Sequence, residues 1–562
     1  MATTLITDFL AKQITKAIDR CVDFFNETGL DRKAIKVTVE KSRNAKFGDY
    51  SCNCALTAGL EHSKAMEFAT VVVKHLSPKY FKKAEVVNPG FINLFVKDEM
   101  LTDIIVEINK AKEEYGKLKR TGKCYNIEFI SANPTGLLHI GHARNAAIGD
   151  TLARIWQEVG IDVTREYYIN DAGNQIEKLA LSVLIRYINL YGRNIPLPED
   201  SYHGAEIIDV AKALKTQFSD KFLYLKYDND KILRTTPREE ELANEIKNYS
   251  KTYLLSIIKK TLAEFGVRID IWYPETDLYR NHLIEAILTN LKSHTYESEG
   301  ALWLKTTEKG DDKDRVLVKS DKTFTYFLPD IAYHNVKLAR GYDKIFNIWG
   351  ADHKSYADRM KIAVQLCGFD KDKLTILIMQ MVRLMKNGQE FKMSKRSGTS
   401  LTMQDLIDAI GKDAARWFLV SQPMDSHLEI DVDKALSKNN NNPLYYVQYA
   451  HARINQVLNK VTLEKKVKSY DELTHPLERE LMVFLSIYPN TLLNISHSYN
   501  PNIITLYLTN LAKLFHAYYE QVKLIDEGSP KLTQQRMKLI EAIKTVIGNG
   551  LRLMNITPVD KM

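Results

Sequence analysis

The sequence predicts an α/β protein with three parts: a Rossmann-like parallel-sheet domain with helical insertions, a small α/β domain before it and an all-α bundle after it. One observation predicts the central part, and another predicts the bundle. Short apolar runs alternate with segments of helical apolar spacing from about residue 123 onward, and such alternation is typical of a doubly wound parallel sheet. For the bundle, residues 443–562 show helical spacing and no convincing strand.

The N-terminal part, residues 1–115, mixes helix and strand patterns. Apolar residues from Leu5 to Val22 recur near the 3.6-residue period, which predicts one helix over about the first 28 residues. A Lys- and Glu-rich helix is expected around 101–115, and the glycines that follow it mark a domain boundary. The strands expected between these helices are 35–40, 84–88 and 91–96.

The central part, residues 116–440, carries the predicted parallel sheet. A helix over 139–159 lies between two of its apolar strands and ends before Gly160, a favourable residue after a helix. Residues from about 180 to 270 are charged and largely helical, so we expect them to be an insertion in the sheet. The expected strands are 124–130, 163–169, 344–349 and 374–380, with a helix around 354–367 before the last of them.

The C-terminal part, residues 441–562, follows a run of asparagines at 439–442. Four long segments in it have helical apolar spacing, which favours a separate bundle. The sequence therefore divides into three expected domains, within the range that 562 residues predict.

Composition limits the class of protein. Hydrophobic residues make up 45% and charged residues 26%, as in ordinary globular proteins. Lys and Arg number 78 against 70 Asp and Glu, and the resulting net charge of +8 permits a polyanionic partner without requiring one. The cysteines lack zinc-ligand spacing, so we expect no structural metal and a reducing compartment; they are Cys21, Cys52, Cys54, Cys124 and Cys367.

The N-terminus has neither the basic-then-apolar pattern of a secretory signal nor the Arg-rich composition of a transit peptide. No stretch approaches the roughly 18 uninterrupted apolar residues of a membrane span. The sequence therefore predicts a cytoplasmic protein with no membrane association.

The first chemical motif is His139-Ile140-Gly141-His142, set between a strand and a helix. Unpaired N–H groups at a helix start favour a phosphate, and Gly141 leaves room for a base or ribose against the backbone. Two histidines three residues apart share one side and can donate hydrogen bonds to phosphate oxygens. Four residues alone leave open the alternative of two ordinary surface histidines.

The second motif is Phe391-Lys392-Met393-Ser394-Lys395-Arg396, in a loop with glycines on either side. Lysine is a compact, mobile point charge, which suits the β- and γ-phosphates of a nucleotide. An isolated pair of lysines is more often a solvated basic loop.

The two motifs occur in this order on opposite halves of one expected sheet, and with them the sequence resembles class I aminoacyl-tRNA synthetases. Within that class it resembles the arginyl-tRNA synthetase family, over essentially the whole chain. The segments that carry the narrower resemblance are 127–150, 170–180, 272–276, 325–334, 349–361, 442–454 and 550–562.

The resemblance implies a two-step reaction in which arginine attacks the α-phosphorus of ATP and the arginyl group then passes to the 2′-OH of the terminal adenosine of tRNA(Arg). It implies that His139 and His142 act at the α-phosphate and that Lys392 and Lys395 hold the β- and γ-phosphates. The implied ATP-binding residues are His139, Gly141, His142, Asp352, Lys392, Met393 and Lys395. Magnesium would arrive with ATP, without zinc or any protein-built metal site.

A guanidinium substrate needs carboxylates and a flat hydroxyl-bearing partner around it. By resemblance these are Glu275, Asp330 and Tyr326, while Asn133, with Glu128 nearby, binds the α-amino and carboxylate end. Each is also a polar residue at a strand end, where a surface role is the usual alternative.

The expected tRNA contacts lie in both flanking domains. Tyr445 and Tyr449 at the start of the bundle could stack on anticodon bases, although their spacing also suits a helix core. By resemblance, Asn88, Phe91 and Asn93 contact the outer corner of the tRNA, with a core role for Phe91 as the alternative. The family usually acts as a monomer.

Two other functions remain open at this point. A class I synthetase for another amino acid, such as cysteine, is disfavoured by the missing zinc-ligand cysteines and by the acidic pocket residues. A catalytically silent tRNA-binding relative is disfavoured because both histidines and both lysines of the two motifs are present.

Overall fold

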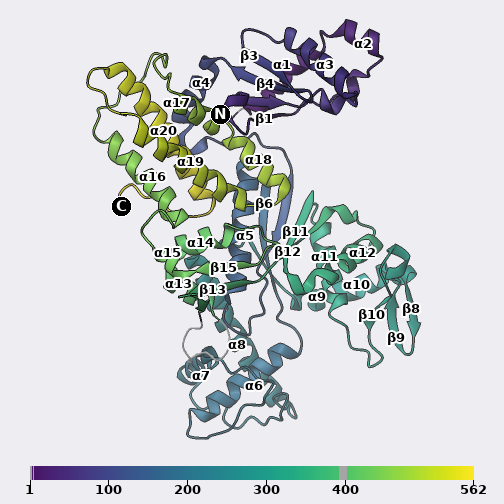
Figure 1. Cartoon of the computed structure of the whole chain (residues 1–562). Coiled ribbons are helices and arrows are strands. Elements are labelled where there is room, and N and C mark those ends of the chain that lie inside the picture. The colour runs from purple at the N-terminus through teal and green to yellow at the C-terminus, as the bar shows by residue number, and fades with distance from the viewer. Residues whose placement is uncertain (1–2, 4, 392–400) are drawn as a thin grey trace. The chain divides into compact units, whose positions relative to one another are not determined.

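The structure, a computed structural model, describes residue 3, residues 5–391 and residues 401–562. It divides into two compact units (Figure 1). The first comprises Met1–Thr121, Glu158–Gly160 and Ser437–Met562, and the second comprises Gly122–Gln157 and Ile161–Leu436. The N-terminal and C-terminal parts of the chain thus belong to one unit.

The first unit begins with two helices where the sequence predicts one, so the prediction of a single helix over the first 28 residues is wrong. The chain turns after Ile18: the N–H groups of Arg20 and Cys21 bond carbonyls only three residues earlier, which tightens the last turn. Cys21 is buried, and its backbone leaves the helical region. Apolar spacing does not detect so short an interruption. The two helices are α1 (Ile6–Ile18) and α2 (Val22–Thr28).

A four-stranded sheet follows, in the order β1-β2-β4-β3 with antiparallel neighbours. The two later predicted strands are confirmed, whereas the first is shorter than predicted because only its last two residues join the sheet. Gly48 is required between β1 and β2, since a Cβ there would lie 2.8 Å from the carbonyl oxygen of Leu94. The elements are β1 (Val39–Lys41), β2 (Tyr50–Cys52), α3 (His62–Lys74), β3 (Phe81–Val87), β4 (Phe91–Val96) and α4 (Asp98–Ala111).

The C-terminal part of this unit is helical, as predicted, and it packs on the N-terminal part. Arg479 donates to both carboxylate oxygens of Asp49, at 2.8 and 2.6 Å, and also bonds Asp98. The hydroxyls of Tyr50 and Ser486 lie 2.6 Å apart in the buried interface. The helices are α16 (Pro443–Leu458), α17 (Pro476–Ser486), α18 (Tyr488–Ser498), α19 (Asn502–Gln521) and α20 (Pro530–Leu553).

The second unit is built on a five-stranded parallel sheet in the order β12-β11-β5-β6-β7. The predicted strands are confirmed, as is the helix α5 (Ile140–Glu158) after the first of them. Strand order reverses between β5 and β11, so their carboxyl ends form a topological switch point. The strands are β5 (Cys124–Glu128), β6 (Asp162–Ile169), β7 (Ile271–Pro274), β11 (Lys344–Gly350) and β12 (Leu374–Met379).

The predicted insertion is three helices between β6 and β7, seen in Figure 1 as a separate cluster. They enclose an apolar core of their own. The longest begins at a capping box in which Thr236 and Glu239 bond each other's backbone N–H, with Pro237 in the first turn. The helices are α6 (Asn174–Asn189), α7 (Ala205–Phe218) and α8 (Pro237–Glu264).

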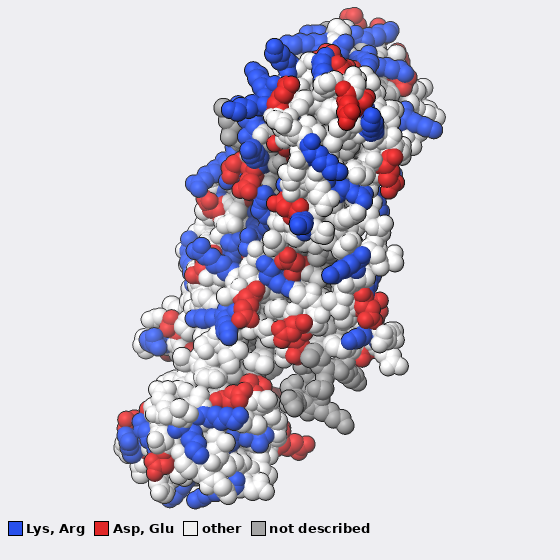
Figure 2. All heavy atoms as spheres, turned by 90° about the vertical axis from the view of Figure 1, so that its left-hand side faces the viewer, with Lys and Arg blue, Asp and Glu red and all other residues white. Residues whose placement is uncertain are grey.

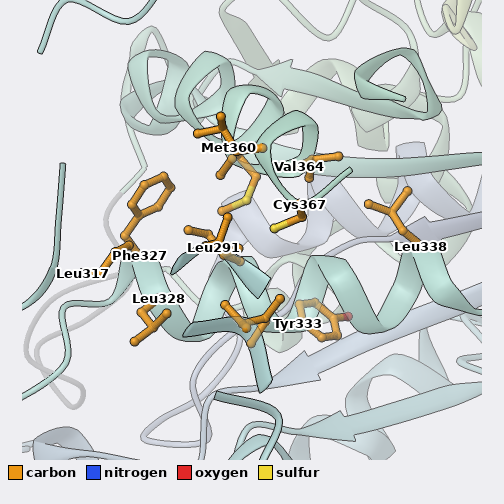
Figure 3. Close-up of a cluster of buried hydrophobic side chains, with 14 of the residues drawn as sticks. Leu291, Leu317, Phe327, Leu328, Tyr333, Leu338, Met360, Val364 and Cys367 are labelled. Atoms are coloured by element: carbon orange, nitrogen blue, oxygen red, sulfur yellow. The ribbon is translucent and has the colours of Figure 1, made fainter. Parts of the chain in front are cut away.

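A second insertion, between β7 and β11, was not predicted. It contains an antiparallel sheet of three short strands, whose mostly half-buried residues give no clear apolar alternation. Its helices pack with α12 (Lys354–Leu366) around a buried cluster that includes Leu291, Phe327 and Met360 (Figure 3). The elements are α9 (Thr276–Arg280), α10 (Leu283–Asn290), β8 (Thr295–Ser298), β9 (Ala301–Leu304), β10 (Arg315–Val318) and α11 (Phe327–Ala339).

The rest of this unit follows β12 with a small sheet in the order β14-β13-β15. Its elements are β13 (Val382–Lys386), β14 (Gln389–Glu390), α13 (Met403–Ile410), α14 (Lys412–Val420), β15 (Leu428–Asp431) and α15 (Val432–Leu436). No described helix combines the length and the apolar character needed to cross a membrane.

Candidate active site

The predicted site residues of the second unit gather at the carboxyl ends of its parallel strands. Glu128 ends β5, Glu275 follows β7, and Asp352 follows β11. In open α/β sheets this edge, at the switch point, is where ligands bind. The sheet therefore brings together residues that lie far apart in the sequence.

The two histidines of the first motif stack on each other at the start of α5, with ring centroids 3.6 Å apart. Nδ1 of His142 accepts the N–H of His139 at 3.1 Å, and Nδ1 of His139 accepts the N–H of Gly141 at 3.0 Å. Each ring therefore carries its proton on Nε2. Burial lowers the pKa of His142 to about 3, and the neighbouring His139 adds to the shift. Both rings are neutral donors at pH 7.

Gly141 leaves room for the ring of His139 beside its own backbone. A Cβ on it would lie 2.8 Å from Cε1 of His139, closer than van der Waals contact allows. The ring of His139 thus occupies the space that any side chain at position 141 would need.

The chain that leaves the second motif returns to the first. The N–H of Ile140 bonds the carbonyl of Leu401 at 3.0 Å, and the N–H of Met403 bonds the carbonyl of Leu138 at 2.7 Å. The residues predicted to hold phosphates, Lys392, Met393 and Lys395, lie outside the described residues, as does Arg396. On the other side, Phe391 ends the described hairpin by bonding the carbonyl of Leu384 at 2.8 Å.

The predicted guanidinium ligands Glu275 and Asp330 form a pair of like charges. Burial raises the pKa of Glu275 to about 7, and the Asp330 carboxylate adds to the shift. Burial also raises the pKa of Asp330 to about 6 against a 2.6 Å hydrogen bond from the hydroxyl of Tyr356. Among the described residues, no Lys or Arg forms an ion pair with either carboxylate. Such a pair is suited to binding a cation.

Two tyrosines that the sequence did not single out border this pair. The hydroxyl of Tyr279 donates to Oε1 of Glu275 at 3.3 Å. Tyr168 is buried, and its pKa is raised by burial and then by the charges of Glu275 and Asp330. Its hydroxyl stabilises the charge of Glu275. The two carboxylates therefore lie among tyrosine rings and hydroxyls.

Glu128 already has a cationic partner, which the sequence did not predict. Nζ of Lys337, a fully buried lysine on α11, lies 2.5 Å from Glu128 and 2.8 Å from Oδ1 of Asn347. Nδ2 of Asn347 lies 2.8 Å from Nε2 of His334, whose Nδ1 donates to the carbonyl of Asp330 at 2.7 Å. The indication of this contact in the sequence was a lysine on an otherwise apolar helix face. This network fixes the backbone on which Asp330 is carried.

The remaining predicted residues lie at the edge of the site. Nδ2 of Asn133 donates to Gln175 at the start of α6, at 2.5 Å. Tyr326, just before α11, is 76% exposed. Asp352 is also exposed, and its Oδ2 lies 3.4 Å from Nε2 of the exposed His353. The ring of His353 in turn contacts that of Trp349 on β11, with ring centroids 6.3 Å apart.

The predicted tRNA contacts lie in the first unit. Phe91 is 37% exposed at the start of β4, and Asn88 is exposed with Oδ1 at 2.5 Å from Nε2 of His62. Asn93, by contrast, is 4% exposed inside the sheet. A core role for Phe91, the alternative left open by the sequence, does not agree with this exposure.

Tyr445 and Tyr449 stack on α16 with ring centroids 5.9 Å apart. Both line a groove of about 690 Å³. The guanidinium of Arg453 lies over the Tyr449 ring, 4.4 Å from its centroid. The other lining residues are Lys438, Asn439, Asn440, Asn441, Tyr446, His516 and Glu520. Half-buried aromatic rings beside cations and amides form a surface on which an unpaired base can stack.

Comparison with known proteins identifies all three parts of the chain. Residues 8–96 match the arginyl tRNA synthetase N terminal domain, residues 103–457 match the catalytic domain of class I tRNA synthetases (R), and residues 447–562 match the DALR anticodon binding domain.

The chain is 47% identical to an arginine–tRNA ligase of Malacoplasma penetrans, over 92% of this chain and 93% of that protein. It is 44% identical to an arginine–tRNA ligase of Ureaplasma parvum, over 99% of this chain and 100% of that protein. The arginyl-tRNA synthetase structure from Thermus thermophilus has the same fold, with a TM-score of 0.76, 21% identity and coverage of 99% and 100%. The chain belongs to the arginyl-tRNA synthetase family of class I aminoacyl-tRNA synthetases.

Proposed function

We propose that the chain attaches L-arginine to tRNA(Arg) in two steps. In the first, a carboxylate oxygen of arginine attacks the α-phosphorus of ATP, and diphosphate leaves as arginyl-adenylate forms. In the second, the 2′-OH of the terminal adenosine of the tRNA attacks the arginyl carbonyl, and AMP leaves. Neither step needs a covalent enzyme intermediate, so the protein contributes position and charge stabilisation.

The pair formed by Glu275 and Asp330 carries the proposal. Two carboxylates with raised pKa and no described cationic partner can both ionise when a guanidinium binds between them. The five donors of arginine match these acceptors, and citrulline, its neutral isostere, offers no positive charge. This pair favours arginine over the other amino acids of class I enzymes, including cysteine.

On the ATP side, we assign hydrogen-bond donation to Nε2 of His139 and of His142, at the start of α5. Because both rings are neutral, they act as donors without adding a full positive charge to the site. Lys392 and Lys395 would hold the β- and γ-phosphates, with Asp352 and Met393 also near the nucleotide. Among the described residues, no group of three His, Cys, Asp or Glu is placed to hold a metal ion, so Mg²⁺ would be carried by the nucleotide.

On the tRNA side, we assign the outer corner to Asn88 and Phe91 and the anticodon loop to Tyr445 and Tyr449. Because Asn93 is buried inside the four-stranded sheet, it suits a role in holding the turn that carries Asn88 and Phe91 rather than direct contact with a base. Figure 2 shows Lys and Arg interspersed with Asp and Glu over the face drawn, in keeping with the small net charge. Base stacking must therefore supplement charge attraction in tRNA binding.

We also propose that the three predicted domains, 1–115, 116–440 and 441–562, divide the work among outer-corner contact, chemistry and anticodon contact. The chain would act as a monomer in the cytoplasm. Mass determination in solution with and without tRNA tests the first of these two statements.

The deciding experiment is charging of total tRNA with each of the twenty amino acids and with citrulline. We expect charging with arginine alone. Charging with another amino acid, or with none, would overturn the proposal. Charging with citrulline at a comparable rate would overturn the role of the carboxylate pair while leaving the enzyme class intact.

A further inference from the structure

A buried carboxylate that the proposed reaction does not use lies directly beside Glu275. Asp171, just after β6, has a side chain that is 3% exposed. Its Oδ1 accepts the N–H of Thr276 at 2.9 Å, and its Oδ2 lies 3.1 Å from the Thr276 hydroxyl. Thr276 is the first residue of α9 and follows Glu275 in the chain. Asp171 thus holds the backbone that carries Glu275.

The charge of Asp171 is balanced from the helical insertion. Nζ of Lys251, on α8, lies 2.9 Å from Oδ2 of Asp171. The same oxygen accepts the Thr276 hydroxyl, so the lysine and α9 share one carboxylate. A buried carboxylate without a cation is costly and tends to take up a proton or move. Lys251 is therefore the cation that pairs with Asp171 and holds its side chain in place.

The same helix offers a matched ion pair that lacks this connection. Lys247 lies one turn before Lys251, and its Nζ is 3.1 Å from Oε1 of Glu177. The two lysine side chains are similarly exposed, 28% for Lys247 and 22% for Lys251. Glu177 bonds Arg234 as well. No described contact joins Glu177 to α9, so this pair joins α8 to α6 within the insertion.

We propose that Lys251 is a positioning residue for arginine recognition, acting through Asp171 and Thr276 on Glu275. This rests on the proposed role of Glu275 in binding the guanidinium. The backbone N–H of Glu275 itself bonds the carbonyl of Ile169 at 2.9 Å. The backbone on both sides of the Glu275 side chain is therefore fixed by hydrogen bonds. Helix α8 of the insertion thus determines how precisely Glu275 is placed in the amino-acid pocket.

The groups that face Glu275 explain why its position matters. Asp330 and Asp171 repel its charge, whereas the hydroxyls of Tyr168 and Tyr279 stabilise it. A shift of α9 changes all of these distances together. It also changes the distance to a bound guanidinium, whose hydrogen bonds depend steeply on geometry. ATP contacts at the start of α5 would be unaffected.

The test is arginine-dependent ATP–pyrophosphate exchange by the full chain in the presence of tRNA, with the KM for arginine, the KM for ATP and kcat measured separately. The variants are Lys251→Met, Lys251→Arg and the matched control Lys247→Met. We expect Lys251→Met to raise the KM for arginine about tenfold, with kcat and the KM for ATP within about twofold. Lys251→Arg should restore most of the loss, and Lys247→Met should stay within about twofold throughout.

Equal effects of Lys251→Met and Lys247→Met on the KM for arginine would overturn the inference. So would a loss by Lys251→Met that falls equally on arginine and ATP. If Lys251→Met does not fold, Thr276→Val tests the same connection by removing only the hydroxyl. It should raise the KM for arginine about threefold, and an unchanged KM would be contrary evidence. A wild-type chain with no arginine-dependent exchange would instead overturn the proposed function itself.

Discussion

Two sites with carboxylates in the second unit differ in the charged partners of those carboxylates. In the middle of α5, Asp150 is fully buried and is surrounded by arginines. Arg416, which is also fully buried, lies 2.7 Å from it, Arg154 lies 2.8 Å from it and Arg165 lies 3.5 Å from it. At the sheet edge, Glu275 and Asp330 have no arginine or lysine partner among the residues that the structure describes.

The difference separates charge that supports the fold from charge that is kept for a ligand. A buried carboxylate must be paired, protonated or hydrogen-bonded. The chain pairs Asp150 with its own arginines, whereas it leaves the other two carboxylates with raised pKa values and hydroxyl partners. An incoming arginine would complete the second group in the same way that Arg416 completes the first. The comparison can be tested by removing one carboxylate from each.

The largest effect is expected for Asp150→Asn. Removing its charge leaves two buried guanidinium groups, Arg416 and Arg165, without a full counter-charge. Breaking a buried ion pair from one side costs about 3–5 kcal/mol. We expect a large fall in the denaturation midpoint, measured by circular dichroism, with kcat/KM per folded molecule nearly unchanged at low temperature. A midpoint close to that of the wild type would mean that this group is not structural.

The next effect is expected for Asp330→Ala, with the opposite signature. The bound guanidinium would lose one of its two carboxylates, and kcat/KM for arginine should fall about 30- to 1000-fold. This fall corresponds to about 2–4 kcal/mol of lost transition-state stabilisation. Stability should not fall, because the repulsion between Asp330 and Glu275 is removed. Parallel thermal melts supply the control. Near-normal kcat/KM would refute the assignment of Asp330.

The pH dependence of arginine binding tests the proposed role of Glu275 and Asp330 without a mutation. Both pKa values, about 7 for Glu275 and about 6 for Asp330, lie above those of an unfolded chain. Between about pH 4 and pH 7 the native state therefore holds protons that the unfolded state has released, and these groups lower stability as pH rises. Arginine needs both carboxylates ionised, so its affinity should rise about 20-fold from pH 6 to pH 8.

Thermal shifts induced by arginine at several pH values measure this directly. The shift should be larger at pH 8 than at pH 6, even though the ligand-free protein gains stability toward pH 6 from these two groups. Asp330→Ala should flatten the dependence. A shift that does not change with pH would show that the two carboxylates are ionised before arginine binds.

The sequence was sufficient for features that depend on local pattern. The alternation of apolar strands with α5 and α12 predicted the parallel sheet, and helical spacing predicted the C-terminal bundle. The strands β8 to β10 were missed because they are only four residues long and show no clear apolar alternation. The break between α1 and α2 was missed because apolar spacing continues across it.

The contacts that position the site could not be predicted, since they join distant residues. Lys337 bonds Glu128, 209 positions earlier in the chain, and Lys251 bonds Asp171, 80 positions earlier. Nothing near either lysine in the sequence indicates its partner. Only the fold brings them together, and the same holds for the bond between Ile140 and Leu401.

The smallest effects are expected for two glycines of α5, which repeat the comparison within one helix. At Gly149, a Cβ would lie 2.5 Å from Cγ of Phe129, a buried ring with no room to move. At Gly141, a Cβ would meet only the ring of His139, which is exposed and can turn away. Gly149→Ala should therefore lower stability by about 1–3 kcal/mol with little effect on kcat.

Gly141→Ala should instead lower kcat and leave stability unchanged. Turning the His139 ring would move its Nε2 donor from the position proposed for the α-phosphate, and loss of one such donor typically costs about 100- to 1000-fold in rate. Because the ring can relax, we expect about tenfold in kcat for pyrophosphate exchange, with an unchanged melting temperature. The two alanine variants, measured side by side, control for each other. If Gly141→Ala lost stability and kept its rate, the start of α5 would belong with Asp150 among the structural features rather than with the ligand-binding edge.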